Sequence, residues 1–241
     1  MNKKTLLIVV VAILLTGAIT YALTQTTTPE VEQNTNQVDA SDYISAHQEI
    51  STLPLENLTA DEKEGLVIMR EEEKLARDVY LTLYNKWGLS IFRNIASSEQ
   101  THTDSIRYLI ERYNLTDPVT DETIGVFTNQ TFQDLYTALV KQGEQSLIEA
   151  LKVGATIEDL DIKDLQEFIE GTDNQDIITI YENLLRGSRN HMRSFDKQLT
   201  QNGGTYTAQY LEQAEIDKIL AGSQERGDGN GDGNSQSGRN R

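Results

Sequence analysis

The chain has 241 residues, carries 21 basic against 38 acidic side chains for a net charge of −17 at pH 7, and contains no cysteine. This charge repels phosphate backbones, so it argues against nucleic-acid binding and favours cations as small partners. The absence of cysteine excludes disulfides, iron–sulfur clusters, thiolate zinc sites and cysteine nucleophiles. Any bound metal must therefore have oxygen and imidazole ligands.

Near the N-terminus, Lys3 and Lys4 precede the uncharged apolar run TLLIVVVAILLTGAITYAL. The run is long enough to span a bilayer and no clear cleavage site follows it, so residues 1–24 are expected to form a transmembrane anchor. A cleaved signal segment, which would make the protein secreted, is the alternative. The two lysines place the N-terminus inside, so under either interpretation the domain is expected outside the cytoplasm.

Two polar segments flank the central part of the chain. Residues 25–58 are rich in Thr, Gln, Asn and Glu, and residues 223–241 are almost entirely polar. Neither segment has enough apolar surface to offset its ordering entropy, so the first is expected to be a flexible stalk and the second a disordered tail. The tail matches the first half of a calcium loop, but Arg239 stands where a bidentate Glu is required, which argues against calcium. Residues 59–222 remain as one domain.

This domain is helical by its caps, breakers and apolar periodicity. Thr59 and Glu62 form a capping box at its start, and no stretch alternates with period two, so no substantial sheet is expected. The helical runs cover about 59–87, 90–113, 131–143, 146–170 and 175–201. Two long helices, a crossover with a short helix, and two more long helices predict an all-α four-helix bundle with one long crossover.

Each long run carries an ionisable side chain on its apolar stripe. The 3–4 spacing places Glu73 in the first stripe, Glu99 and His102 in the second, Glu158 and Asp161 in the third, and His191 in the fourth. Tyr80 and Tyr181, which lie on the same stripes, are interpreted as core aromatics.

Buried carboxylates of this kind cost several kcal/mol each unless something compensates their charge, and a pair of divalent cations would do so. The helix register supports convergence, because Glu73 and His102 lie roughly 21 and 18 Å from the turn that joins their helices. Glu158 and His191 lie roughly 20 and 26 Å from theirs. In addition, Glu99 and His102 are three residues apart on one helix and face the same way, as a chelating pair must.

Several segments resemble known proteins. A Glu on one helix, Glu-x-x-His on the next, a Glu on the third and a His on the fourth resemble the ferritin-like di-iron and di-manganese carboxylate bundles, including rubrerythrins and bacterioferritins. More closely, EEEKLARDVYLTLYNKWG, NIASSEQTH, IEDLDI and GSRNHMRSF look like the uncharacterised ferritin-like family called domain of unknown function 2202, over about residues 60–220. The resemblance implies a ferritin-like fold.

The same resemblance implies a ligand set and shows one departure from it. It carries over Glu73, Glu99, His102, Glu158 and His191 as metal ligands. The last helix of the superfamily normally reads Glu-x-x-His, whereas here Ser188 occupies the first of those positions. Asp161, which lies one turn after Glu158, is a candidate replacement. If Asp161 does not reach the site, one metal or a more open pair is expected.

The ligand set determines the expected chemistry. Carboxylates with two imidazoles suit two iron or two manganese ions. The prediction is an outward-facing di-metal protein that acts on Fe(II), oxygen or peroxide as a ferroxidase or peroxidase, with an external electron donor because the chain has no cysteine for a rubredoxin-like module. The alternative is a non-enzymatic surface helical module that binds a partner without metal turnover. The sequence leaves open whether the bundle forms a homodimer.

Overall fold

The computed structural model describes residues 47–226. The predicted anchor or signal at 1–24, residues 25–46 of the predicted stalk and residues 227–241 of the predicted tail lie outside this part of the chain. Among residues 47–226, no helix has the length and apolar character needed to cross a membrane.

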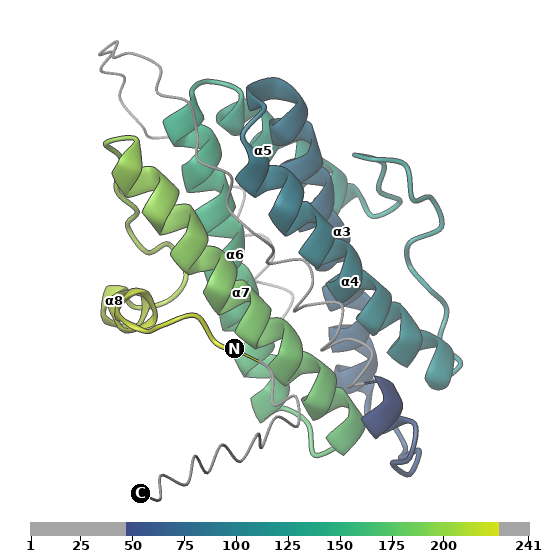
Figure 1. Ribbon diagram of the computed structural model, residues 1–241. Coiled ribbons are helices and arrows are strands. Elements are labelled where there is room, and N and C mark those ends of the chain that lie inside the picture. Colours follow the sequence, from purple (N-terminus) through teal and green to yellow (C-terminus); the bar gives the residue numbers. More distant parts are fainter. Residues whose placement is uncertain (1–46, 227–241) are drawn as a thin grey trace, which may run out of the picture.

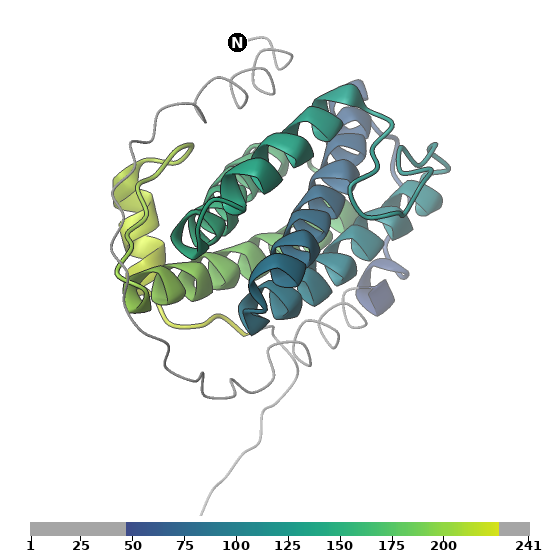
Figure 2. The ribbon, with the colours of Figure 1, turned by 90° about the horizontal axis from the view of Figure 1, so that it is seen from above.

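Four long helices form a bundle, as the sequence predicts. They are α3 (Ala60–Trp87), α4 (Ser90–Arg112), α6 (Leu147–Glu170) and α7 (Gln175–Gln201). Helices α3 and α4 pack as one pair, and α6 and α7 as the other (Figures 1 and 2). The described residues contain no strand, which agrees with the all-α prediction.

Two shorter helices within residues 47–226 pack against the bundle. Helix α5 (Gln130–Gly143) belongs to the predicted crossover and packs against α3 and α6. Helix α8 (Gln213–Ala221), which the sequence analysis did not separate, packs against α7 and is seen end-on in Figure 1, so it runs across the bundle.

Local signals fix most of the helix ends. Thr59 and Glu62 form the expected capping box, and Gly88 ends α3 in the left-handed region at φ 69°, where glycine avoids the strain of a Cβ atom. Helix α6 runs unbroken through Gly154, whose small size lets Phe195 of α7 pack against it. Ser90 is the first residue of α4, which has no side-chain cap at its N-terminus.

Parts of both predicted flexible segments pack on the bundle. Ile50, placed in the stalk by its composition, is fully buried, and the Leu53 carbonyl accepts a 2.8 Å hydrogen bond from Arg112. At the other end Glu225 pairs with Arg189 and Arg193 of α7. A few apolar or charged residues at a segment's edge gain enough from the domain surface to order it, although the average composition does not show this.

The core consists of two apolar clusters at opposite ends of the bundle. One includes Tyr80, Phe92 and Phe195, and the other includes Leu66 and Ile106. Each long helix contributes to both clusters, and the candidate site residues of α3 and α4 lie in the sequence between the two contributions. The clusters thus hold the helices together above and below a polar layer.

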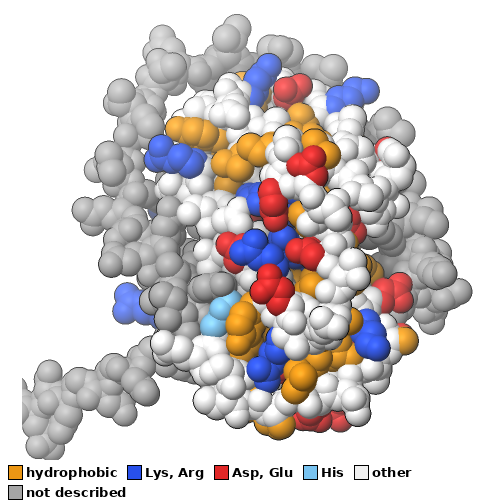
Figure 3. Space-filling model, turned by 90° about the vertical axis from the view of Figure 1, so that its right-hand side faces the viewer, with side chains coloured by type: hydrophobic (Ala, Val, Ile, Leu, Met, Phe, Trp, Pro, Cys, Tyr) orange, Lys and Arg blue, Asp and Glu red, His pale blue; other side chains and the backbone are white. Residues whose placement is uncertain are grey.

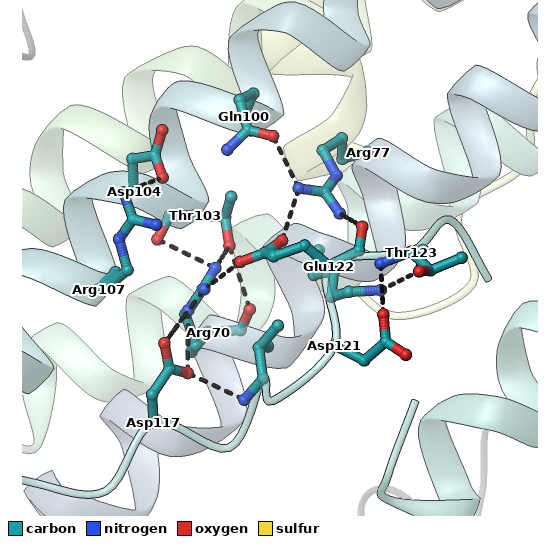
Figure 4. Close-up of polar contacts among 12 residues, drawn as sticks. Arg70, Arg77, Gln100, Thr103, Asp104, Arg107, Asp117, Asp121, Glu122 and Thr123 are labelled. Carbon is teal, nitrogen blue, oxygen red and sulfur yellow. Dashed lines mark hydrogen bonds and ion pairs between the residues drawn. The ribbon is translucent and has the colours of Figure 1, made fainter. Parts of the chain in front are cut away.

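Buried cations on α3 fasten the crossover to the bundle (Figure 4). Arg70 binds Glu122 at 2.7 Å and also pairs with Asp117, while Arg77 donates to Glu122 at 3.0 Å. Lys74 donates to the carbonyl oxygens of Thr123 and Val126. Figure 3 shows basic and acidic side chains interleaved near the middle of the face at the right of Figure 1, where the crossover lies.

Glu62 also ties the start of α3 to the turn between α6 and α7. It accepts hydrogen bonds from the Thr59 backbone at 2.7 Å and from Asn174 at 2.8 Å, and it accepts a further bond from Thr172. Burial alone would raise the pKa of Glu62, but the bonds from Thr172, Thr59 and Asn174 outweigh burial and lower the pKa below its ordinary value of 4.5. The ionised carboxylate is therefore the stabilising form.

We expect Glu62→Gln to lower the free energy of unfolding by about 1 kcal/mol at pH 7. Because the folded-state pKa is depressed, this stabilisation is present above about pH 4.5 and is lost as pH falls through the folded-state pKa. Urea unfolding of the unaltered protein and of Glu62→Gln, measured at several pH values from neutral to acid, should show that their difference in unfolding free energy shrinks as the pH falls. Glu64→Gln, at an exposed position of α3, is the control and should change little. A pH-independent difference would contradict this assignment.

Candidate metal centre

Five of the six predicted ligands meet in the polar layer between the two apolar clusters. Their exposed fractions are 1% for Glu73, Glu99 and Glu158, 5% for His102 and 6% for His191. They come from α3, α4, α6 and α7, so the site exists only when all four long helices are assembled. These residues form two groups of three potential ligands, Glu73–Glu99–His102 and Glu99–Glu158–His191.

Glu99 belongs to both groups and lies between them. Its Oε2 is 2.8 Å from Nδ1 of His102, and its Oε1 is 2.9 Å from Nδ1 of His191. The two imidazole rings lie 5.6 Å apart between centroids. A carboxylate with one oxygen directed to each triad has the arrangement of a bridging ligand.

The outer carboxylate of each triad lies slightly farther from its histidine. Oε2 of Glu73 is 3.3 Å from Nδ1 of His102, and Oε2 of Glu158 is 3.4 Å from Nδ1 of His191. Each histidine therefore directs the same ring nitrogen at two carboxylate oxygens. One cation placed among these three atoms could contact all of them.

Several of the candidate ligand atoms have no hydrogen-bond partner in the protein. Nδ1 of both histidines, Oε1 of Glu73 and Oε1 of Glu99 are buried and have no hydrogen-bond partner of acceptable geometry. Buried polar atoms normally have partners, and each exception costs about 1–3 kcal/mol. These unpartnered oxygen and nitrogen atoms gather at the centres of the two triads. Divalent cations there would neutralise the carboxylates and accept the nitrogen lone pairs.

Neighbouring side chains orient two of the candidate ligands. Nε2 of His191 lies 3.0 Å from the Ser98 hydroxyl, a contact that can hold the proton on Nε2 and leave Nδ1 free as a metal ligand. The Tyr80 hydroxyl donates a 2.5 Å hydrogen bond to Oε1 of Glu158. Tyr80 is therefore a core aromatic, as expected, but its hydroxyl also holds a candidate ligand.

A glycine on α7 makes room for His102. A Cβ atom at Gly187 would come within 2.6 Å of Cε1 and Nε2 of the His102 ring. Any larger residue here would displace the imidazole, because real Cβ contacts are not that short. The close approach of α7 to α4 thus fixes the position of the candidate ligand His102.

The charges of the site are strongly coupled. For Glu99, burial alone would raise the pKa, but attraction to His191 and His102 outweighs burial and lowers it. For both histidines burial favours the neutral ring, yet the carboxylates, with Glu99 foremost, raise the pKa of each. Burial raises the pKa of Glu73 and of Glu158. In the absence of a cation, protons would have to supply the missing positive charge.

Asp161, the sixth predicted ligand, does not join either triad. Its carboxylate accepts a hydrogen bond from Ser188, the residue that stands where a superfamily Glu was expected. Burial and repulsion from Glu158 and Glu99 raise the pKa of Asp161. The two residues that depart from the ligand pattern therefore contact each other at the edge of the site, and the role of Asp161 as a replacement ligand stays a prediction.

Sequence comparison places this helical bundle in a family. Residues 62–223 match the family described as an uncharacterized protein domain, DUF2202. The chain belongs to the DUF2202 family. This agrees with the closer of the two resemblances seen in the sequence.

Relatives of this DUF2202 protein share most of its length. It is 59% identical over 178 residues to the uncharacterized protein MJ0754 of Methanocaldococcus jannaschii, a match that covers 74% of this chain and 96% of the relative. It is also similar to the crystal structure of the hypothetical protein MJ0754 from Methanococcus jannaschii, with a TM-score of 0.71 and 58% identity over 72% of this chain and 99% of the other. The names of these relatives state neither a ligand nor an activity.

Sequence reasoning missed several residues around the site of this DUF2202 protein. Ser98 and Gly187 had no sequence signal, because a serine or a glycine on a helix is common. Glu72 lies beside Glu73 in a run of three Glu that resembles a solvated face, yet it is 7% exposed. The signal that could have found it is the immediate context, since Arg70 through Tyr80 are all buried and α3 is therefore enclosed on every side.

We expect Mn(II) to raise the melting temperature of the metal-free protein, because a ligand that binds only the folded state stabilises it by about 2.7 kcal/mol at a concentration one hundred times its Kd. Glu99→Gln should abolish most of this rise, since it removes the charge shared by both triads. Differential scanning calorimetry with and without Mn(II) measures the effect. Glu167→Gln, on the exposed side of α6, should behave like the unchanged protein. Equal metal-induced shifts in all three proteins would refute the assignment.

Proposed function

We propose that this protein is a ferritin-like di-metal protein that binds two iron or two manganese ions and is redox-active toward Fe(II), oxygen or peroxide. The observation that carries the proposal is Glu99, whose two oxygens face two separate histidines from opposite helix pairs. The order of two helices, a crossover with α5, and two further helices supports the ferritin-like interpretation.

The donor set supports the choice of metal. Three carboxylates and two imidazoles without any thiolate favour iron or manganese over copper(I) or structural zinc. Two such ions, when bound, would each supply one electron to a small oxidant. The chain contributes the frame for this chemistry: Glu99 sets the separation of the two positions, and Glu73 and Glu158 close the set on the outer sides.

Other residues of the chain would keep the site in one geometry. Tyr80 holds Glu158 by its hydroxyl, and Ser98 holds the ring of His191. The apolar clusters on both sides exclude bulk water, which strengthens the electrostatic attraction between the ligands and a cation. The proposal also includes an external electron donor, because the chain has no cysteine, and an outward-facing domain, because of the apolar N-terminal run.

The redox part of the proposal is tested by stopped-flow absorbance. Protein loaded anaerobically with two equivalents of Fe(II) is mixed with oxygen or with hydrogen peroxide, and Fe(III) formation is followed against Fe(II) in buffer alone. We expect oxidation faster than in buffer, and its loss in His102→Ala and His191→Ala, which each remove one imidazole. Tyr80→Phe should bind both ions but oxidise them more slowly, because Glu158 loses the hydrogen bond that holds it.

The outcomes separate the proposed redox protein from its alternatives. Two bound Fe(II) ions that oxidise no faster than free Fe(II) would contradict the redox function and leave a binding or storage role. Metal-free protein with an unchanged melting temperature after exposure to Fe(II) and Mn(II) would contradict the metal centre itself and favour the surface module.

A further inference from the structure

A small cavity lies directly beside the two triads, between α3, α5 and α6. Its volume is about 30 Å³, and its lining includes the ligand candidates Glu99 and Glu158. Each of the three helices contributes apolar side chains to its wall, among them Leu75, Leu135 and Ile157. The cavity thus reaches the centre from the side on which the crossover helix α5 packs.

The charged residues of this cavity are all of one sign. Glu72, Glu99, Glu158 and Asp161 line it, and none of its lining residues is a lysine, arginine or histidine. A recess with apolar walls and only acidic groups concentrates a negative potential, which attracts cations and repels anions.

Glu72 is the unexplained member of this group. It is 7% exposed, it lines the cavity, and neither of its carboxylate oxygens has a hydrogen-bond partner of acceptable geometry. It belongs to neither triad, whereas its neighbours have defined contacts: Glu71 accepts a 3.1 Å bond from Asn129, and Glu73 faces His102. Asp164 of α6, a second buried carboxylate, lies close enough to Glu72 to interact with it. Two buried carboxylates cost several kcal/mol unless a positive charge compensates them, so this pair calls for either a shared proton or a cation that visits it.

The outer side of the cavity is less buried than its inner side. Thr156, Leu160 and Tyr210 are partly exposed, while Glu99 and Glu158 are almost completely buried. Tyr210 is held in place through Asp159, which accepts hydrogen bonds from the backbone nitrogens of Tyr210 at 3.1 Å and of its neighbours on both sides. The cavity therefore has a defined outer end formed by α6 and the segment after α7.

We propose that this cavity is the route by which divalent cations reach the two triads, and that Glu72 is a transient ligand on the way. The inference rests on the proposed function, because it takes the triads as the destination. A cavity of about 30 Å³ has room for very few water molecules, so a cation must shed most of its hydration shell there. The two carboxylate oxygens of Glu72 would replace part of that shell.

Stopped-flow binding of Co(II), followed by its visible absorption in the purified full chain, tests the route. Glu72→Gln keeps the size of the side chain and removes its charge, and we expect it to load two equivalents roughly tenfold more slowly, as for loss of electrostatic steering. Glu71→Gln is the matched control from the same Glu run and should load at the unchanged rate. Leu135→Trp, which fills the cavity from α5, should also slow loading and slow removal by a chelator.

The possible results are distinct. If the unaltered protein binds no Co(II), the proposed function fails before the route is tested. If it binds two equivalents and Glu72→Gln loads at the same rate, the route is overturned, and a proton shared between Glu72 and Asp164 would account for the buried pair. If Glu72→Gln binds fewer than two equivalents at saturation, Glu72 is a permanent ligand and the transient role is overturned. Circular dichroism checks that each variant is folded. Glu72→Asp keeps the negative charge, so it should load faster than a folded Glu72→Gln.

Discussion

The burial of several carboxylates around two imidazoles is the constraint on which the rest of this structure depends. Glu73, Glu99 and Glu158 are each 1% exposed, and removing such charges from water costs far more than an ordinary hydrogen bond returns. The two histidines can balance part of this charge when protonated, but their Nδ1 atoms make no well-formed hydrogen bond to the carboxylates. A pair of divalent cations would balance the charge and use those atoms, which is why the metal centre is the interpretation that best accounts for the geometry.

The remainder of the fold serves to keep this layer closed. Apolar clusters close it at both ends. The crossover covers one side of α3, where the buried side chains of Arg70, Lys74 and Arg77 bind loop carboxylates and carbonyl oxygens. The basic and acidic side chains of α3 therefore point to different sides. The basic side chains hold the crossover, whereas Glu73 faces the bundle axis. The run from Arg70 to Tyr80 is enclosed by protein on all sides although it is one of the most charged parts of the chain.

The sequence was sufficient to predict the helices and five of the converging side chains, for identifiable physical reasons. Helix ends follow from local signals such as the Thr59–Glu62 box, and the inward stripes follow from the 3.6-residue period. What it could not supply depends on contacts between distant segments. The hydrogen bond from Ser188 to Asp161, the burial of Glu72 and the packing of Ile50 are decided by partners 27 or more residues away or by the shape of the assembled surface. The family resemblance to DUF2202 was visible in separated motifs, whereas the ferritin-like function remains the proposal that the geometry supports.

Crystals grown with Mn(II) and measured above and below the manganese absorption edge test the central claim most directly. The account predicts two anomalous peaks in the bundle, one among Glu73, Glu99 and His102 and the other among Glu99, Glu158 and His191, with Glu99 between them. An absence of anomalous density between these side chains, at Mn(II) concentrations that occupy other sites on the same molecule, would contradict it.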